Sequence, residues 1–191
     1  MVDRRIEAGI DAGRPGPPRG GVGEDPDVFR EVMAGWVTGV AIVAVRDPDD
    51  GRVYATTVSS LASVSADPPR IVISLGPGAQ ALPFLQAPGP EARGEARPGT
   101  RFVVSVLAEE QAGLARRYAD PYPVGASPFP EEGDPVVEGA SGVMVCEVAE
   151  IFPVGSCRLV VALVQEALPG GGAGSRPAPL LHHEREYRSL S

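Results

Sequence analysis

The stretch Gly39-Val40-Ala41-Ile42-Val43-Ala44-Val45 is apolar throughout and rich in β-branched residues. It is too short for an independent helix, and valine and isoleucine favour extended backbone, so it predicts a β-strand. The next residues, Asp47-Pro48-Asp49-Asp50-Gly51, have the side chains typical of a turn. Residues 52–60 then return as a second strand, so the sequence predicts a β-hairpin.

The segment before this hairpin predicts a helix. Asp25-Pro26 combines a capping residue with a proline at the first helical position. The apolar residues that follow lie on one helical face; they are Val28, Phe29, Val32, Met33 and Trp36. Residues 1–24 are rich in arginine, glycine and proline and lack apolar periodicity, so we expect a disordered leader before a single domain over residues 25–191.

Further strands follow the hairpin, with short helices inserted among them. Strands are expected at residues 70–75, 101–107, 143–152 and 158–166, and helices at residues 81–85 and 109–118. Residues 87–100 form a proline-, glycine- and arginine-rich insertion that predicts a surface loop, and residues 180–190 form a last segment after a glycine-rich turn. About six strands that do not alternate with helices exclude a doubly wound parallel sheet and favour a mainly β, closed antiparallel barrel.

Composition limits the possible functions. The formal charge of −8 argues against non-specific nucleic-acid binding, although all 17 basic residues are arginine and a local basic pocket remains possible. Cys146 and Cys157 form neither a disulfide framework nor a metal motif. The adjacent His182 and His183 point to opposite faces of a strand and are poorly placed to chelate one ion. No apolar stretch is long enough for a membrane helix, so we expect a reduced, cytoplasmic protein.

The chain contains no general catalytic motif: there is no P-loop, no dinucleotide fingerprint, no HExxH and no GxSxG. One local feature is Thr56-Thr57-Val58-Ser59-Ser60, where hydroxyl-bearing residues end a strand. Hydroxyls and free backbone amides at a strand end can bind the edge of a flat polar heterocycle. The alternative is an ordinary strand edge rich in threonine and serine, and spacing alone does not separate the two.

A series of short motifs then follows in a fixed order over residues 28–190. They are Phe29-Arg30-Glu31-Val32-Met33-Ala34-Gly35-Trp36-Val37-Thr38-Gly39-Val40, Thr57-Val58-Ser59-Ser60, Ser63-Val64-Ser65 with Pro68-Pro69, Leu82-Pro83-Phe84-Leu85, Phe102-Val103-Val104-Ser105-Val106-Leu107, Leu114-Ala115-Arg116-Arg117-Tyr118, and Pro179-Leu180-Leu181-His182-His183 through Tyr187-Arg188. In this order they resemble the flavin reductase family of FMN-binding split β-barrels. Each motif is weak alone, and their order makes the resemblance specific.

The resemblance implies an antiparallel Greek-key barrel with short flanking helices that dimerises and holds FMN or FAD at the dimer interface. Members of the family oxidise NADH or NADPH and release reduced flavin, often to a partner monooxygenase. The flavin carries out the hydride chemistry, so no catalytic side chain is implied. By the same resemblance, Thr57, Val58, Ser59 and Ser60 line the isoalloxazine ring and the ribityl chain.

The sequence departs from the family where the flavin phosphate binds. The family's S-x-T, whose hydroxyls contact the phosphate, is here Ala79-Gln80-Ala81. The family's asparagine on the fourth strand is Ser105. Each lost hydrogen bond to a charged group is worth about 1.5–3 kcal/mol, so flavin affinity is expected to fall about a hundredfold or more.

The nicotinamide side of the site also differs. The family's glycine-x-histidine corresponds to Gly155-Ser156-Cys157, and its Gly-Glu pair corresponds to Ala162-Leu163. Cys157, His183 and Tyr187 are the candidates there, although an isolated histidine such as His183 often serves packing alone.

Two functions follow from these features. The first is an NAD(P)H-dependent flavin reductase that binds flavin loosely, as a diffusible substrate. The second is a split barrel that has lost flavin reduction and binds another planar ligand or acts as an accessory subunit. The intact Thr57–Ser60 stretch favours the first function, whereas Ala79, Ala81 and Cys157 favour the second. The choices between FMN and FAD and between NADH and NADPH stay open, as does the role of residues 87–100.

Overall fold

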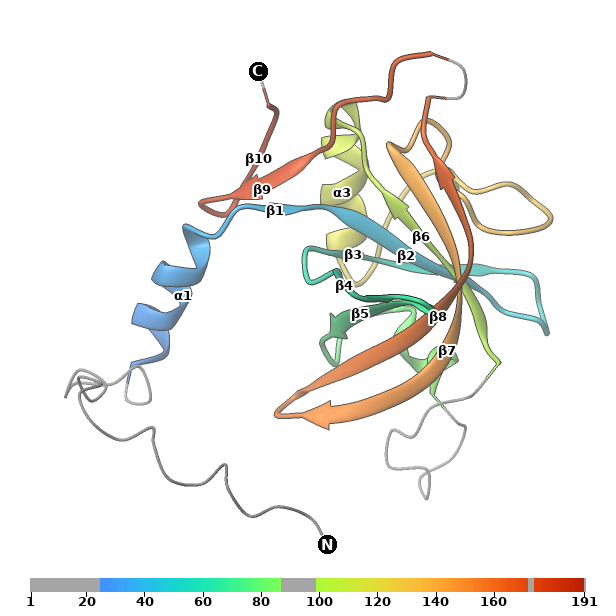
Figure 1. Ribbon diagram of the computed structural model, residues 1–191, viewed down its shortest axis with the longest axis horizontal. Coiled ribbons are helices and arrows are strands. Elements are labelled where there is room, and N and C mark those ends of the chain that lie inside the picture. Colours follow the sequence, from blue (N-terminus) through green and yellow to red (C-terminus); the bar gives the residue numbers. More distant parts are fainter. Residues whose placement is uncertain (1–24, 87–98, 172–173, 191) are drawn as a thin grey trace, which may run out of the picture. The chain divides into compact units, whose positions relative to one another are not determined.

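The computed structural model describes residues 25–86, 99–171 and 174–190 (Figure 1). The predicted leader and nearly all of the predicted insertion lie outside these residues. The chain divides into two units, one ending at Trp36 and the other spanning Val37–Ser191.

The second unit contains an antiparallel sheet of seven strands (Figure 1). Strands β6, β7 and β8 pair in chain order, and β8, the last of them, lies beside the earlier strand β5. This is a Greek-key arrangement. In spatial order the strands are β3 (Val53–Val58), β2 (Ala41–Arg46), β6 (Arg101–Val106), β7 (Gly142–Val154), β8 (Cys157–Pro169), β5 (Pro69–Leu75) and β4 (Ala62–Ala66).

The two ends of this sheet approach each other through a side chain. The Ser60 hydroxyl, just after β3, donates to the carbonyl of Ser74 on β5 at 2.9 Å and accepts from its N–H at 3.0 Å. Strands β3 and β4 are the two edges of the sheet, and no backbone ladder joins them to each other. The expected closed barrel is therefore corrected to a split one, joined here by a serine rather than by a ladder.

Strand β2 explains why the Gly39–Val45 stretch shows no polar alternation. Its side chains are buried on both faces of the sheet. Val43 and Val45 lie in the core inside the barrel, which also contains Phe102 and Ile73. Ile42 and Ala44, at the alternate positions, face a second core that the sheet forms with the helix after β6. A strand covered on both faces reads as a continuous apolar run.

The helices are short. They are α1 (Pro26–Ala34), α2 (Leu82–Leu85), the 3₁₀ helix η2 (Glu109–Gln111) and α3 (Ala112–Ala119). The Asp25 side chain accepts a hydrogen bond from the Asp27 N–H at 2.9 Å, so the predicted cap of α1 is confirmed. Among the helices of the described residues, none is long and apolar enough to cross a membrane.

The sequence missed some of the short strands, although it placed His182 and His183, which lie in one of them, on a strand. A three-stranded sheet combines β1 (Thr38–Gly39), β9 (Leu181–His183) and β10 (Glu186–Arg188), and β4 extends the large sheet. Strand β4 reads Ala-Ser-Val-Ser-Ala, with one β-branched residue, and is held by its ladder to β5 rather than by its own propensity. Its partner is the next strand in the chain, with Ala66 paired to Pro69, but the serine- and alanine-rich sequence of β4 gives no strand signal of its own.

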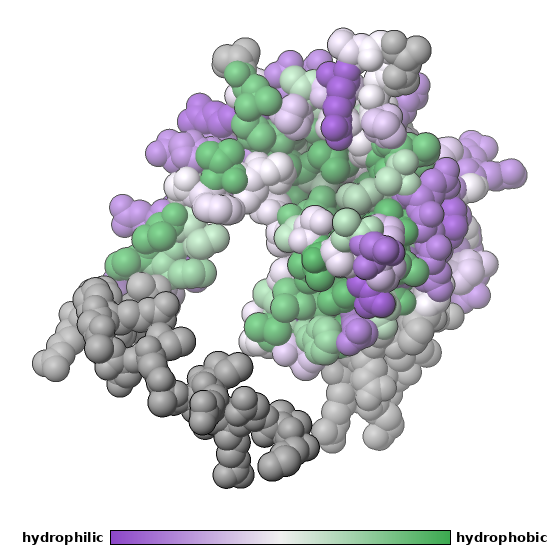
Figure 2. All heavy atoms as spheres, in the orientation of Figure 1, coloured by the Kyte–Doolittle hydropathy of each residue, from purple (hydrophilic) through white to green (hydrophobic). Residues whose placement is uncertain are grey.

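The predicted apolar face of α1 exists and is exposed. Val32 is 67% exposed and Trp36, just after the helix, is 65% exposed. No residue of α1 is buried, and Figure 2 shows hydrophobic side chains gathered on this helix. Large exposed apolar patches usually mark an interaction surface.

Candidate functional site

A pocket of about 440 Å³ lies where β3 ends, and we call it the strand-end pocket. Its volume is within the range of small-molecule sites. None of the described residues that line it carries a charge. They are Thr56, Thr57, Val58, Ser59, Ser60, Ser74, Leu75, Gly76, Gly78, Ala79, Tyr118, Ala119, Pro121 and Cys157. The structure thus brings Thr57, Val58, Ser59, Ser60, Ala79 and Cys157 together, as the resemblance implied.

The hydroxyls in this pocket have different partners. Thr57 donates to the carbonyl of Ala115 at 2.8 Å and so ties β3 to α3. Ser60 is bound to Ser74 on both its donor and its acceptor side. Ser59 makes no side-chain hydrogen bond within the described part of the chain, so its hydroxyl remains available to a ligand.

The residues at the family's phosphate motif separate in the structure. Ala79 lines the strand-end pocket, where a serine hydroxyl would meet a ligand. The Gln80 N–H donates to the Thr56 hydroxyl at 3.3 Å, and the Gln80 side-chain amide donates to the carbonyl of Pro121. Ala81 has no exposed surface and packs in the barrel core.

Other candidates lie away from this pocket. Ser105 is buried on β6, and its hydroxyl accepts the Val137 N–H at 3.1 Å. His183 belongs to β9 and Tyr187 to β10, and neither lines the strand-end pocket within this chain. The Tyr187 ring lies 5.8 Å from that of His182, and burial raises the Tyr187 pKa.

The two cysteines differ in accessibility. Cys146 is fully buried, and burial raises its pKa to about 12, so it remains a thiol at neutral pH. Cys157 is half-buried and faces the strand-end pocket. Both are free, as predicted, although only Cys146 is fully buried. Within the described residues, no group of histidine, cysteine and carboxylate side chains could hold a metal ion.

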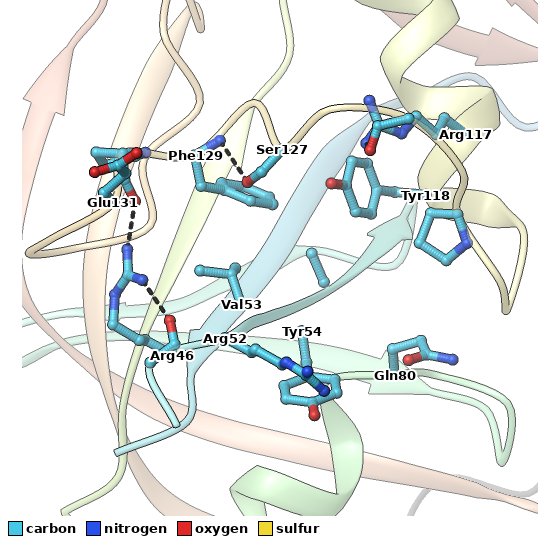
Figure 3. A pocket seen from close by; sticks show the side chains of 15 residues that line it. Arg46, Arg52, Val53, Tyr54, Gln80, Arg117, Tyr118, Ser127, Phe129 and Glu131 are labelled. Carbon is cyan, nitrogen blue, oxygen red and sulfur yellow. Dashed lines mark hydrogen bonds between the residues drawn. The ribbon is translucent and has the colours of Figure 1, made fainter. Parts of the chain in front are cut away.

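A second pocket, of about 510 Å³, lies beside the first (Figure 3). We call it the arginine pocket because Arg46, Arg52 and Arg117 line it, together with a single carboxylate, Glu131. The sequence analysis missed it, since these arginines are far apart in the chain and each looks like an ordinary surface residue. A search for arginines on both sides of a predicted hairpin would have found Arg46 and Arg52, but not Arg117.

The strand-end pocket fits a flavin ring better than it fits an acid–base site. An uncharged pocket lined by hydroxyls, of which that of Ser59 has no partner within the described residues, can hold the polar edge of a planar heterocycle. Arginine side chains lie near the strand-end pocket but do not line it. Arg117, in the arginine pocket, directly precedes Tyr118, which lines both pockets. The residues present can therefore bind and orient a flavin, which supplies its own redox chemistry.

Comparisons with known proteins identify the family of this chain. Residues 33–191 match the family model described as flavin reductase like domain. The chain is 30% identical to the reductase component of 4-hydroxyphenylacetate 3-monooxygenase from Thermus thermophilus, over 86% of this chain and 96% of that protein. It is 32% identical to an NADH-dependent FMN reductase from Streptomyces nodosus subsp. asukaensis, over 85% of this chain and 83% of that one.

A solved structure extends the likeness to the fold. The styrene monooxygenase flavin reductase from Pseudomonas putida S12 is 27% identical, with a TM-score of 0.65 over 85% of this chain and 97% of that chain. The order of the strands, the pocket at the end of β3 and these matches converge on one family. The chain belongs to the flavin reductase family.

Proposed function

We propose that this protein is an NAD(P)H-dependent flavin reductase that takes FMN or FAD as a diffusible substrate and releases it reduced. The observation that carries this proposal is the uncharged strand-end pocket, where Ser59 offers a free hydroxyl beside Ala79. Family membership supports it as well. The relatives include reductase components of monooxygenases, so we extend the proposal to a partner monooxygenase that receives the reduced flavin.

In this proposal the flavin accepts the hydride, and the chain binds and orients it. Ser59 donates to the polar edge of the ring, and Val58 supplies an apolar wall. The Thr57 hydroxyl is committed to Ala115, so it fixes the distance between β3 and α3 instead of contacting the ligand. Cys157 and the nicotinamide-side residues His183 and Tyr187 complete the site.

Weak phosphate binding agrees with release of the product. Ala79 removes one hydroxyl that would hold the phosphate, and Ala81 cannot contact any ligand because it is buried in the core. A substrate that must leave after each turnover gains nothing from tight binding in the ground state.

We also propose that the protein is a homodimer in a reducing cytoplasm. Its exposed apolar α1 face, centred on Val32, supports self-association, and its free cysteines are compatible with a reducing compartment. A dimer would let His183 and Tyr187 serve the strand-end pocket of the partner subunit, which they do not reach within one chain.

The test is oxidation of NADH and NADPH by the purified protein with FMN, with FAD, and without added flavin. We expect turnover that depends on added flavin and saturates with it. Absence of turnover with every pair, from protein shown to be folded by a cooperative thermal transition, would mean that the barrel has lost flavin reduction and has another role.

A further inference from the structure

We propose that the arginine pocket is the subsite for an ADP group, the half that FAD shares with NADH and NADPH. The inference rests on the proposed function, because it assumes that the isoalloxazine ring lies in the strand-end pocket. It adds a second subsite, and it assigns roles to Arg52 and Arg117.

The two pockets are continuous along β3. Val53, Tyr54 and Ala55 line the arginine pocket, and Thr56 to Ser60 line the strand-end pocket. Tyr118 lines both. At about 3.3 Å per residue, Tyr54 and Ser59 are separated by roughly 17 Å of strand. Gln80, within the phosphate motif, lines the arginine pocket, so the phosphate of a mononucleotide would lie at its edge, whereas a dinucleotide would extend into it.

The charge of the pocket favours an anion. Three arginines face one carboxylate in a chain whose formal net charge is −8. Arg46 donates only to backbone carbonyls, at 2.9 Å to Gly133, 2.6 Å to Gly51 and 2.6 Å to Pro130. Carbonyl partners hold the guanidinium in place without neutralising it, so its positive charge still acts in the pocket.

Arg117 is held in the same way. Its Nη2 donates to the carbonyls of Gly125 and Ala126, at 2.9 and 2.6 Å. Its Nε is buried without a hydrogen-bond partner in the described part of the chain, so a ligand does not reach this atom. The carbonyl contacts of Nη2 leave the charge of the guanidinium uncompensated, and an anion such as a diphosphate would supply the opposite charge.

The exposed stacking surface of the pocket is a guanidinium. The rings of Tyr118 and Phe129 meet edge to face with their centroids 5.5 Å apart, and both are buried. Tyr54 stacks on Phe84, with ring centroids 4.1 Å apart. Figure 3 shows the two buried rings on one side of the pocket and Arg52 with Tyr54 on the other. Arg52 is 77% exposed, and a guanidinium plane can stack on a planar base such as adenine.

This arrangement accounts for the lost phosphate hydroxyls. Gln80 lines the arginine pocket while its neighbour Ala79 lines the strand-end pocket, so the altered motif stands at the boundary between the two. Anchoring the ligand through the arginines of the arginine pocket makes a hydroxyl at position 79 dispensable.

Arg52 is the best position for a test. Its side chain is 77% exposed, and among the described residues its only ion-pair contact is Asp50 at 3.4 Å, so its replacement leaves the loops in place. Arg70→Gln is the control: Arg70, on β5, is also an exposed arginine with one weak ion-pair partner among the described residues, Glu150 at 4.0 Å, and it lines neither pocket.

The experiment measures the binding of FMN, FAD and ADP by fluorescence quenching and calorimetry, and the KM for NADH. If the ADP group belongs to FAD, FAD binds about tenfold or more tightly than FMN, and ADP competes with FAD for binding. Arg52→Gln then weakens the binding of FAD about tenfold and leaves the binding of FMN unchanged. If it belongs to the nicotinamide nucleotide, ADP competes with NADH and Arg52→Gln raises the KM for NADH. Arg70→Gln changes none of these values.

Equal FMN and FAD affinities, with no ADP binding and no effect of Arg52→Gln on either cofactor, would overturn the subsite and leave the flavin reductase proposal standing. Absence of any flavin binding would instead contradict the proposed function. In that case, ADP binding that is lost in Arg52→Gln would still support the subsite.

Discussion

Ser59 and its neighbours show how one strand end divides its hydroxyls between folding and binding. The Thr57 hydroxyl donates to the carbonyl of Ala115 and so attaches α3 to β3. The Ser60 hydroxyl donates to the carbonyl of Ser74 and so joins the two ends of the split barrel. Ser59 is left free and faces the strand-end pocket. Both interpretations that the sequence left open therefore apply, at different residues: Thr57 and Ser60 behave as an ordinary strand edge, and Ser59 is available to a ligand.

Replacing Ser59 by alanine should weaken flavin binding without affecting the fold. Loss of one hydrogen bond to a neutral ring atom costs about 0.5–1.5 kcal/mol, so the dissociation constant should rise up to about tenfold while the melting temperature is unchanged. Ser63→Ala on exposed β4 is the control, since Ser63 does not line this pocket. An unchanged dissociation constant, measured by flavin fluorescence, would remove Ser59 from the site.

Ala79 and Ala81 should respond in opposite ways to restoration of the family's hydroxyls. Ala79→Ser places a donor in the pocket and should tighten flavin binding about tenfold. Ala81→Thr adds volume to a core position with no exposed surface and should lower the free energy of unfolding by about 1 kcal/mol or more. If Ala81→Thr tightened flavin binding and kept the stability, the position of this loop would be wrong.

At the scale of elements, the long segment between α3 and β7 is attached to the barrel by arginines. Arg46 binds the carbonyls of Pro130 and Gly133, and Arg101 at the start of β6 forms a two-point ion pair with Asp134, at 2.8 and 2.7 Å. This segment forms one wall of the arginine pocket. Its position depends on charge-assisted hydrogen bonds more than on a regular secondary structure.

The ion pair predicts a pH dependence of stability. The hydrogen bond from Arg101 holds the pKa of Asp134 below its usual value. The contribution of this ion pair to the free energy of unfolding is therefore complete above the unfolded aspartate pKa of about 3.9. It is lost as the pH falls through the lower pKa of the folded state. Asp134→Asn should cost up to about 1 kcal/mol at neutral pH, because the pair is partly exposed, and the cost should vanish in acid. Urea unfolding at pH 7 and pH 3 measures both; an equal cost at the two pH values would contradict the assignment.

How far the sequence predicts these elements depends on where their stability comes from. Strands β2, β3, β5 and β6 carry their own apolar, β-branched signal, and the structure confirms them. Strands β4, β1 and β10 have weak signals of their own and are held by their ladders, β4 to β5 and the other two to β9, so local propensity missed them. The site divides similarly: the Thr57–Ser60 stretch is contiguous and was found, whereas the arginine pocket combines three separate segments.

At the scale of the whole molecule, the exposed face of α1 is the feature that one chain leaves unexplained. Val28, Phe29, Val32, Met33 and Trp36 are all between 45% and 67% exposed. Burial of such side chains is worth about 1.5–3 kcal/mol each, so a second copy that covers this face would be strongly favoured.

A charge on this face should therefore dissociate the proposed dimer. Val32→Glu should shift the protein from dimer to monomer in sedimentation at micromolar concentration, because the carboxylate would be buried without a partner. Glu31→Gln, on the same helix, should leave the dimer intact. If wild type sediments as a monomer, the α1 face serves another partner and the dimer proposal fails.

The most direct test of flavin reduction is an anaerobic mixing experiment with excess flavin. The protein is mixed with NADH or NADPH and a large molar excess of FMN or FAD, and the loss of oxidised flavin absorbance is followed. We predict that the flavin bleaches well beyond one equivalent per protomer, since each reduced flavin leaves and is replaced. Bleaching that stops at one equivalent would contradict the diffusible-substrate account, and no bleaching at all would contradict flavin reduction itself.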